Sequence, residues 1–225
     1  MSTFSVAIDG PSGAGKSTIA RAVASEFSFL YVDTGAIYRT VGLAVRRAGV
    51  GSRDAEAVRA LLPELKIDLR YGEDGAQRMF LAGEDVSDEI RTPEISIYAS
   101  DVSAFAFVRE YLMEMQRSLA RTYDVIMDGR DIGTVVLPDA TLKIFLTASA
   151  EARAERRWKE LLEKGQTVTF EEVLRDMEYR DRNDSSREAA PLKAAEDAIV
   201  VDTTELNFEE SCEKVKELIR ERMKK

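Results

Sequence analysis

The stretch Gly10-Pro11-Ser12-Gly13-Ala14-Gly15-Lys16-Ser17 fits the pattern G-x-x-x-x-G-K-[ST] and decides how the rest of the chain is interpreted. An apolar run from Phe4 to Asp9, typical of a buried strand, precedes it, and a helical pattern begins near Lys16. Between a strand and a helix, the glycines let successive backbone N–H groups face one concavity, and the helix adds its positive N-terminal end. Lys16 can reach the β- and γ-phosphates of a nucleotide, and Ser17 can ligate Mg²⁺. A glycine-rich turn without a ligand is the alternative.

Four later apolar runs alternate with helical patterns, at residues 29–32, 124–128, 142–147 and 198–202. With the first run they make five short strands separated by helices, which predicts an α/β fold whose parallel sheet is covered by helices on both faces.

A different pattern occupies the middle of the chain. Residues 66–71 and 77–82 alternate between polar and apolar and are joined by Gly72-Glu73-Asp74-Gly75, which predicts a β-hairpin inserted on the surface of the sheet. Towards the end, Thr169 with Glu172 and Asn207 with Glu210 form capping-box patterns, so a helix is expected to begin after each pair.

Composition narrows the possible classes of protein. The 225 residues are 44% hydrophobic and 32% charged, which suits a folded globular protein, and no run approaches the about 18 apolar residues that span a membrane. The chain has no histidine and one cysteine, Cys212, which excludes a Ser-His-Asp triad and an intramolecular disulfide and favours a reducing compartment. A net charge of −9 argues against nucleic acid as a partner.

A phosphate loop identifies a nucleotide but not a reaction. A GTPase would carry an Asn-Lys-x-Asp signature, which this sequence lacks, and an ATPase motor is usually larger. A small-molecule kinase needs a second pocket for the acceptor. The polar stretches that follow the other predicted strands favour this third class.

Two of these stretches follow the second and third strands, where ligands bind in open α/β sheets. In residues 33–39, Arg39 lies one turn into the next helix and offers a bidentate fork for a phosphate. In residues 128–134, Asp128 could organise water around Mg²⁺, Arg130 could hold a phosphate, and Asp131 could accept a hydrogen bond from an exocyclic amine. The alternatives are a surface arginine in the first stretch and a structural ion pair in the second.

A predicted helix at residues 151–164 carries Arg153, Arg156 and Arg157. Arg153 and Arg157 are four residues apart and share a face. Arginines placed over a transferring phosphoryl group stabilise the charge of its transition state. An exposed helix with mixed charges would produce the same sequence. Residues 180–187, which alternate in charge, have a solvated helix end as their alternative.

Five features follow one another along the chain: the phosphate loop, residues 33–39, the hairpin with residues 83–92, residues 128–134 and residues 180–192. Together, in this order, they make the chain resemble the bacterial cytidylate kinases over essentially its whole length. The resemblance implies a P-loop kinase fold, with a five-stranded parallel sheet flanked by helices, a small CMP-binding insert that contains the hairpin, and a short helical lid. It implies a single domain over residues 1–225, with the core at about 1–62 and 98–225, the insert at about 63–97 and the lid at about 151–167.

The resemblance also implies an activity. A member of this family transfers the γ-phosphoryl group of ATP to CMP or dCMP, giving CDP or dCDP and ADP, with Mg²⁺ and as part of pyrimidine nucleotide metabolism. It implies a monomeric cytoplasmic enzyme without a nucleic-acid or membrane partner. A kinase for another nucleoside monophosphate and a catalytically silent nucleotide-binding protein are the alternatives.

Residue roles follow from the same resemblance. Residues Gly10 to Thr18 are expected to hold ATP, with Ser17 on the metal. The catalytic set is Lys16, Arg130, Arg153 and Arg157. The residues expected to hold CMP are Thr34, Arg39, Ser100, Arg109, Arg130, Asp131, Arg180, Asp184 and Arg187. Among them, Arg39 and Arg130 clamp the phosphate; Thr34, Ser100, Arg109, Asp131 and Arg187 read the cytosine; and Arg180 and Asp184, with Ser100, meet the sugar.

This sequence departs from the family pattern at a few positions. Thr34 stands where some relatives carry serine, which keeps the hydroxyl. Asn183 and Ser185 stand where some relatives carry arginine, which lowers the local positive charge.

Overall fold

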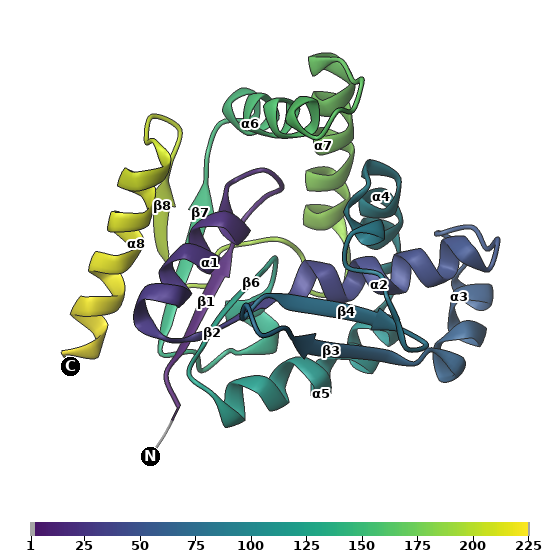
Figure 1. The fold of residues 1–225 in the computed structure, drawn as a ribbon, viewed down its shortest axis with the longest axis horizontal. Helices are drawn as coiled ribbons and strands as arrows, with labels where there is room; N and C mark the ends of the chain where they lie inside the picture. Colours follow the sequence, from purple (N-terminus) through teal and green to yellow (C-terminus); the bar gives the residue numbers. More distant parts are fainter. Residues whose placement is uncertain (1–2, 225) are drawn as a thin grey trace.

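The computed structural model describes residues 3–224, so Met1, Ser2 and Lys225 lie outside the described part of the chain. Its centre is a five-stranded parallel sheet in the order β2-β6-β1-β7-β8 (Figure 1). The strands are β1 (Ser5–Asp9), β2 (Leu30–Asp33), β6 (Val125–Gly129), β7 (Leu142–Thr147) and β8 (Ile199–Asp202). The predicted α/β fold class and parallel sheet are confirmed.

Eight α-helices accompany the strands in the described residues. They are α1 (Lys16–Phe27), α2 (Thr34–Arg47), α3 (Ala55–Leu61), α4 (Pro93–Val102), α5 (Ala106–Thr122), α6 (Ala150–Glu163), α7 (Phe170–Ser186) and α8 (Phe208–Met223). Both predicted capping boxes are present, at the starts of α7 and α8. One π-helical turn, Ile132–Val136, follows β6. No helix within residues 3–224 has the length and apolar character needed to cross a membrane.

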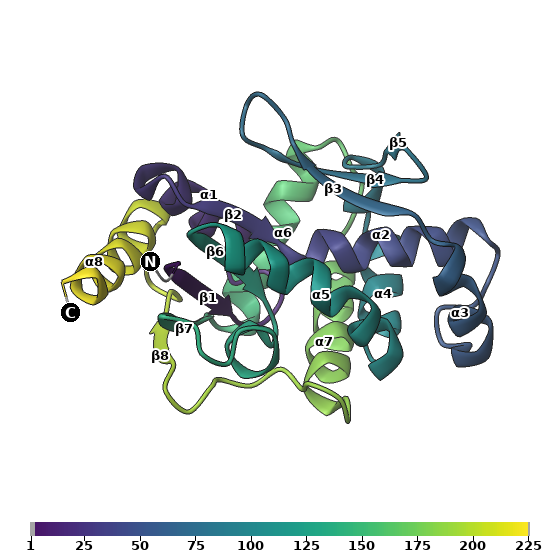
Figure 2. The ribbon, with the colours of Figure 1, turned by 90° about the horizontal axis from the view of Figure 1, so that it is seen from below.

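Side chains of the central strands alternate between two faces of the sheet. Val6 and Ile8 of β1 pack in one apolar cluster with residues of α1 and α8, whereas Ala7 packs in another with Ala120 of α5 and with Ile132. Figure 2 shows α1 and α8 together on one side of the sheet and α5 on the other. The two clusters bury both faces of β1, so the loop that leaves this strand starts from a rigid position.

The predicted hairpin forms β3 (Ile67–Tyr71) and β4 (Gln77–Leu81), and a short strand, β5 (Glu84–Asp85), completes a separate antiparallel sheet. Met79 and Leu81 of β4 are buried in a cluster with apolar residues of α2 and α4. This small sheet lies beside β2 and α2 (Figure 2). The hairpin therefore packs on the elements that follow the second strand of the large sheet.

Replacement of Gly10 by Ala should destabilise the fold strongly. Gly10 ends β1 with a φ of 149°, and a Cβ there would overlap the backbone carbonyl oxygen of Leu146 in β7, which cannot move without breaking the sheet. We expect Gly10→Ala to lower the free energy of unfolding by about 3 kcal/mol in a urea titration.

The matched control is Gly49→Ala. Gly49 also has a positive φ, 69°, but nothing lies within 4 Å of its Cβ position, so only backbone strain of about 1 kcal/mol is expected. Equal losses in the two variants would contradict the steric argument.

Candidate active site

A cavity of about 880 Å³ lies at the carboxyl ends of β1, β2 and β6 and extends between α4, α6 and α7. Its walls come from the phosphate loop, the start of α2, the loop after β6 and helices α4, α5, α6, α7 and α8, and Figure 1 shows where these elements lie. The sheet topology thus brings together the polar stretches that the sequence places after separate strands.

The phosphate loop begins one side of this cavity. Gly15 caps α1 in a left-handed conformation with a φ of 84°, and Gly13 has a φ of 72°. The buried Lys16 ammonium donates a hydrogen bond to the carbonyl of Pro11, at 2.7 Å. Burial, and next the positive charge of Arg130, lower the pKa of Lys16 to about 7. A bound polyphosphate would oppose both effects and hold the ammonium charged.

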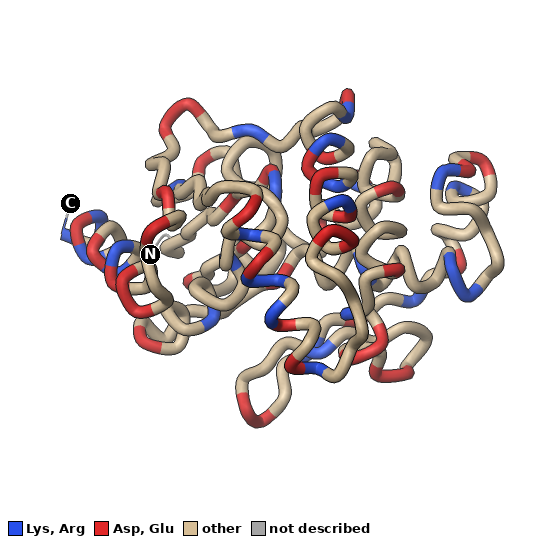
Figure 3. The backbone as a smooth tube through the Cα atoms, turned by 90° about the horizontal axis from the view of Figure 1, so that it is seen from above, with Lys and Arg blue, Asp and Glu red and all other residues tan. Residues whose placement is uncertain are grey.

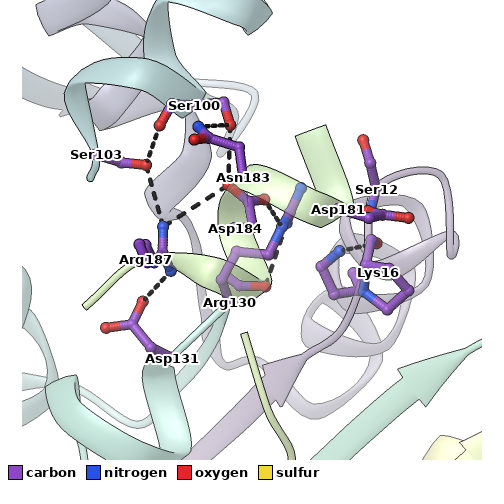
Figure 4. A network of polar contacts seen from close by, with 12 residues as sticks. Ser12, Lys16, Ser100, Ser103, Arg130, Asp131, Asp181, Asn183, Asp184 and Arg187 are labelled. Atoms are coloured by element: carbon purple, nitrogen blue, oxygen red, sulfur yellow. Dashed lines mark hydrogen bonds and ion pairs between the residues drawn. The ribbon is translucent and has the colours of Figure 1, made fainter. Parts of the chain in front are cut away.

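Two side chains of α6 and α7 hold the tip of this loop by the backbone of Ser12. The Ser12 N–H donates to Asp181 Oδ1 at 3.1 Å, and Arg153 Nη1 donates to the Ser12 carbonyl at 2.8 Å and to Asp181 Oδ2 at 2.6 Å. The two side chains therefore form a clamp around the backbone of one residue, Ser12. Figure 4 shows Asp181 beside Ser12 and Lys16.

The carboxylate of Asp128, at the end of β6, lies directly against the phosphate loop. Ser17 Oγ donates to Asp128 Oδ2 at 2.8 Å, and the Tyr31 hydroxyl donates to Asp128 Oδ1 at 2.9 Å. Burial, and next the negative charge of Asp33, raise the pKa of Asp128 to about 6. A divalent cation beside Ser17 would relieve this cost.

These oxygens fit Mg²⁺. The ion prefers oxygen ligands and usually takes few from the protein, with water and phosphate oxygens completing its coordination. Within the described residues no group of three or more His, Cys, Asp or Glu lies together. The site therefore suits an ion that arrives with the phosphates it binds, held by Ser17 with Asp128 behind it.

Ion pairs and hydrogen bonds join α4, α7 and the loop after β6 on the opposite side of the cavity (Figure 4). Arg130 Nε donates to Asp184 Oδ2 at 2.9 Å, and Ser100 Oγ donates to Asp184 Oδ1 at 3.0 Å. Asn183 donates to Ser100 Oγ at 2.9 Å. The buried Asp184 thus fixes the directions of both Arg130 and Ser100.

Deeper in the cavity, on the same side, the Asp131 carboxylate lies between two arginines. Arg109 Nη2 hydrogen-bonds Asp131 Oδ2, and Arg187 Nη2 lies 3.6 Å from Asp131 Oδ1. Arg109 also lies over the Tyr38 ring, 5.3 Å from its centroid. Thr34 Oγ1 donates to the carbonyl of Asp128 at 2.7 Å, so its oxygen is left as an acceptor towards the cavity. This pocket offers donors and acceptors in fixed places.

Several residues that line the cavity carry a buried polar atom that has no hydrogen-bond partner within residues 3–224. These atoms are Tyr38 Oη, Arg39 Nε, Arg109 Nε, Arg180 Nε and Arg187 Nη2. Buried donors are satisfied in nearly all folded proteins, so a cluster of unsatisfied ones in one cavity indicates a ligand that accepts hydrogen bonds.

The cavity also concentrates positive charge. Lys16, Arg39, Arg130, Arg157 and Arg180 line it, and burial, with the neighbouring charge of Arg130, lowers the pKa of Arg180 to about 10. By contrast, α8 carries basic and acidic residues side by side along its length (Figure 3). A site with this charge suits a polyanion.

Most predicted site residues meet in this cavity. Residues 12–18, Thr34, Arg39 and Arg157 line it, as do Ser100, Arg109, Arg130, Asp131, Arg180, Asp184 and Arg187. Gly10 and Pro11, at the start of the phosphate loop, do not line it. Arg153 does not line it either: its guanidinium is occupied by Ser12, Asp181 and the carbonyl of Ala148. Its catalytic role stays a prediction.

Sequence analysis missed some lining residues. Tyr38 is four residues after Thr34, on the same face of α2, and this spacing was the signal that could have found it. Asp181, which holds the phosphate loop without lining the cavity, has no such signal, because its partner Ser12 is 169 residues away.

The family model of cytidylate kinase matches residues 6–221. The chain belongs to the cytidylate kinase family. A cytidylate kinase from Caldicellulosiruptor bescii is 52% identical over 218 residues, covering 97% of this chain and 96% of that one. Cytidylate kinases from Thermosipho melanesiensis and Bacillus licheniformis are 50% and 46% identical, and each alignment covers at least 97% of both chains.

In this cytidylate kinase family member, Arg153 and Arg157 of α6 should respond differently to replacement by methionine. Arg153→Met removes the ion pair of Asp181 and the hydrogen bond to the Ser12 carbonyl, so we expect the free energy of unfolding to fall by about 3 kcal/mol. Among residues 3–224, Arg157 is paired only with the half-exposed Glu160. Arg157→Met should therefore change the free energy of unfolding by less than about 0.5 kcal/mol, and instead lower kcat by about tenfold or more. Urea titrations measure the stability of each variant, and steady-state rates measure its kcat. A loss of stability in Arg157→Met without one in Arg153→Met would contradict the positions described for the two side chains.

Proposed function

We propose that this chain transfers the γ-phosphoryl group of ATP to CMP or dCMP, giving CDP or dCDP and ADP, with Mg²⁺. One observation carries the proposal: a single cavity runs from the phosphate loop to the Asp131 carboxylate between its two arginines. Figure 4 shows Arg130 between these two ends, with Lys16 on one side and Asp131 on the other. Membership of the cytidylate kinase family supports the same reaction.

The donor end holds ATP through residues 10–18. Backbone N–H groups and Lys16 meet the phosphates, and Ser17, with Asp128 behind it, holds the metal ion. Mg²⁺ supplies neutralising charge to the phosphate oxygens. The clamp of Arg153 and Asp181 on Ser12 keeps the loop shaped for the β- and γ-phosphates before ATP arrives.

The acceptor phosphate is held by Arg39 and Arg130, which line the middle of the cavity. This phosphate is itself the nucleophile and is already an anion, so in-line transfer needs no strong general base. The chemistry is thus compatible with a chain that lacks histidine. Lys16 and Arg157 stabilise the charge of the transferring phosphoryl group, and closure of the lid over it excludes water.

The base and sugar are held at the far end. The Asp131 carboxylate accepts a hydrogen bond from the amino group of cytosine, and Thr34, Ser100, Arg109 and Arg187 surround the rest of the base. Uracil would set a carbonyl oxygen against the same carboxylate, which is a strong basis for rejection. The sugar hydroxyls meet Ser100, Arg180 and Asp184.

The proposal includes a monomer that acts in the cytoplasm, in pyrimidine nucleotide metabolism. It divides the chain into a core at about 1–62 and 98–225, an insert at about 63–97 and a lid at about 151–167. The separate hairpin sheet and the position of α6 at the cavity support these divisions.

The reaction is tested by ADP release from ATP and Mg²⁺ with CMP, dCMP, UMP and AMP measured in parallel. We expect kcat/KM for CMP and dCMP to exceed that for UMP and AMP by about 100-fold or more, because the site's buried polar groups match only cytosine. Equal rates with UMP would contradict the role of Asp131. Absence of ADP release with every acceptor, from folded protein that binds ATP, would indicate a silent nucleotide-binding protein.

Asp131→Asn tests base recognition directly. The amide can donate to a uracil carbonyl, so we expect kcat/KM for CMP to fall by about 100-fold and the ratio of CMP to UMP activity to fall with it. Asp68→Asn is the control, because Asp68 is exposed and pairs only with Arg70 on the hairpin surface. An unchanged ratio of CMP to UMP activity in Asp131→Asn would refute this assignment.

A further inference from the structure

The hairpin contacts the outer edge of β2, which is the last strand on its side of the sheet. In a strand, the N–H and C=O of alternate residues point to the same side. Leu30 N–H bonds inwards to the carbonyl of Asp124, so Tyr31 and Asp33 present their backbone groups outwards. Unpaired groups of this kind at a sheet edge need partners.

Two neighbouring residues of the hairpin supply those partners. Tyr71 and Gln77 face each other in the β3–β4 register. The Tyr71 hydroxyl donates to the carbonyl of Tyr31 at 2.9 Å. Gln77 bonds Asp33 twice: its Nε2 donates to the Asp33 carbonyl at 3.1 Å, and its Oε1 accepts from the Asp33 N–H at 2.8 Å. The Gln77 amide thus takes the place of a peptide group in a neighbouring strand.

The side chain of Asp33, whose backbone is held by Gln77, in turn holds groups on the acceptor side of the cavity. Its Oδ1 accepts from Ala36 N–H at 2.8 Å and so caps α2, and its Oδ2 accepts from Arg39 Nη2 at 2.9 Å. Gly35 leaves the space for this pair, since a Cβ there would lie 2.9 Å from Arg39 Nη1. Burial alone would raise the pKa of Asp33, but Arg39 and the Ala36 N–H lower it below its usual range, so the carboxylate stays charged.

Arg39 therefore depends on the backbone position of Asp33. One of its nitrogens is tied to that carboxylate, while Arg39 Nε is buried at the cavity without a partner among residues 3–224. A rotation of the Asp33 peptide would swing the carboxylate and redirect the guanidinium fork.

We propose that Gln77 is a positioning residue for the acceptor's phosphate, acting through the Asp33 backbone on Arg39. The phosphate pocket is complete only when the hairpin lies against β2, so the insert takes part in binding without touching the phosphate. This inference rests on the proposed function, because it takes a nucleoside monophosphate as the acceptor.

The first test compares Gln77→Leu, which removes both hydrogen bonds, with Gln77→Glu, which keeps the length and can still accept from Asp33 N–H. Tyr71→Phe is the matched control: it removes the neighbouring bond between the same hairpin and the same strand edge, but none to Asp33. For both Gln77 variants we expect KM for CMP to rise about tenfold, with KM for ATP within about twofold of the parent. Tyr71→Phe should leave both constants within about twofold.

The second test asks whether the effect passes through Arg39. In an Arg39→Met background, Gln77→Leu should raise KM for CMP by less than about twofold, because the group that it positions is gone. Competitive inhibition by cytidine, which has no phosphate, should be the same in Gln77→Leu and the parent enzyme.

An unchanged KM for CMP in both folded Gln77 variants would overturn the inference. So would an equal rise in Tyr71→Phe, or a Gln77→Leu effect that is undiminished in the Arg39→Met background. The proposed function is judged separately, because it fails only if the unaltered protein does not phosphorylate CMP. If Gln77→Leu proves unfolded by circular dichroism, the same comparisons are made with Gln77→Glu.

Discussion

The Asp9 carboxylate, at the end of β1, makes the contact on which the site depends. It is almost fully buried, and its two oxygens accept hydrogen bonds from the N–H groups of Ile132 and Gly133, each at 2.7 Å. Burial raises the pKa of Asp9 to about 6 although both N–H groups lower it, so this carboxylate is costly to keep charged. The two hydrogen bonds of the Asp9 carboxylate tie the end of β1 to the π-helical turn after β6. That turn sets the directions of Arg130 and Asp131, which immediately precede it.

The same kind of contact recurs around the cavity: a side chain from a distant element holds the backbone at the end of a strand. Asp181 and Arg153 hold Ser12 after β1, Gln77 holds Asp33 at the end of β2, and Asp9 holds the turn after β6. Loops at strand ends have few backbone hydrogen-bond partners of their own, so these side-chain contacts replace the hydrogen bonds that a neighbouring strand would supply. They hold the ligand-facing groups in place before any ligand binds, which reduces the entropy lost on binding.

Local signals carried most of the predictions that the structure confirms. The strand, glycine-rich turn and helix of residues 4–27 are encoded within the stretch itself, and the capping boxes of α7 and α8 need only residues three apart. Helix α4 has a start signal, Thr92 before Pro93, but no clear helical periodicity after it. It buries Ser96, Ser100 and Asp101 as well as apolar residues, so its sequence lacks the contrast between polar and apolar faces that predicts a helix.

The position of Arg153 shows the other limit of sequence analysis. Its spacing to Arg157 places both on one side of α6 but cannot show whether that side meets a loop or a ligand. In the structure, four residues along the helix are enough to separate the two: Arg153 reaches back to Ser12, whereas Arg157 lines the cavity. Such a difference depends on α7, because Asp181 supplies the negative charge that holds Arg153 in place. Arg180 makes no ion pair with a carboxylate in the described part of the chain, and it lines the cavity.

The charges in the cavity also explain why its two ends work as one site. Arg130 is tied to Asp184 on the acceptor side, and burial, followed by the positive charge of Arg130, lowers the pKa of Lys16 at the donor side. Ligands at either end bring negative charge to the same group of cations, so each relieves part of the repulsion that remains. The phosphate chain of the donor and the single phosphate of the acceptor would repel each other in water but can approach here, because the protein has already assembled the opposite charge between them. Phosphoryl transfer between two anions requires this arrangement, and the fold provides it by ending three parallel strands at one cavity.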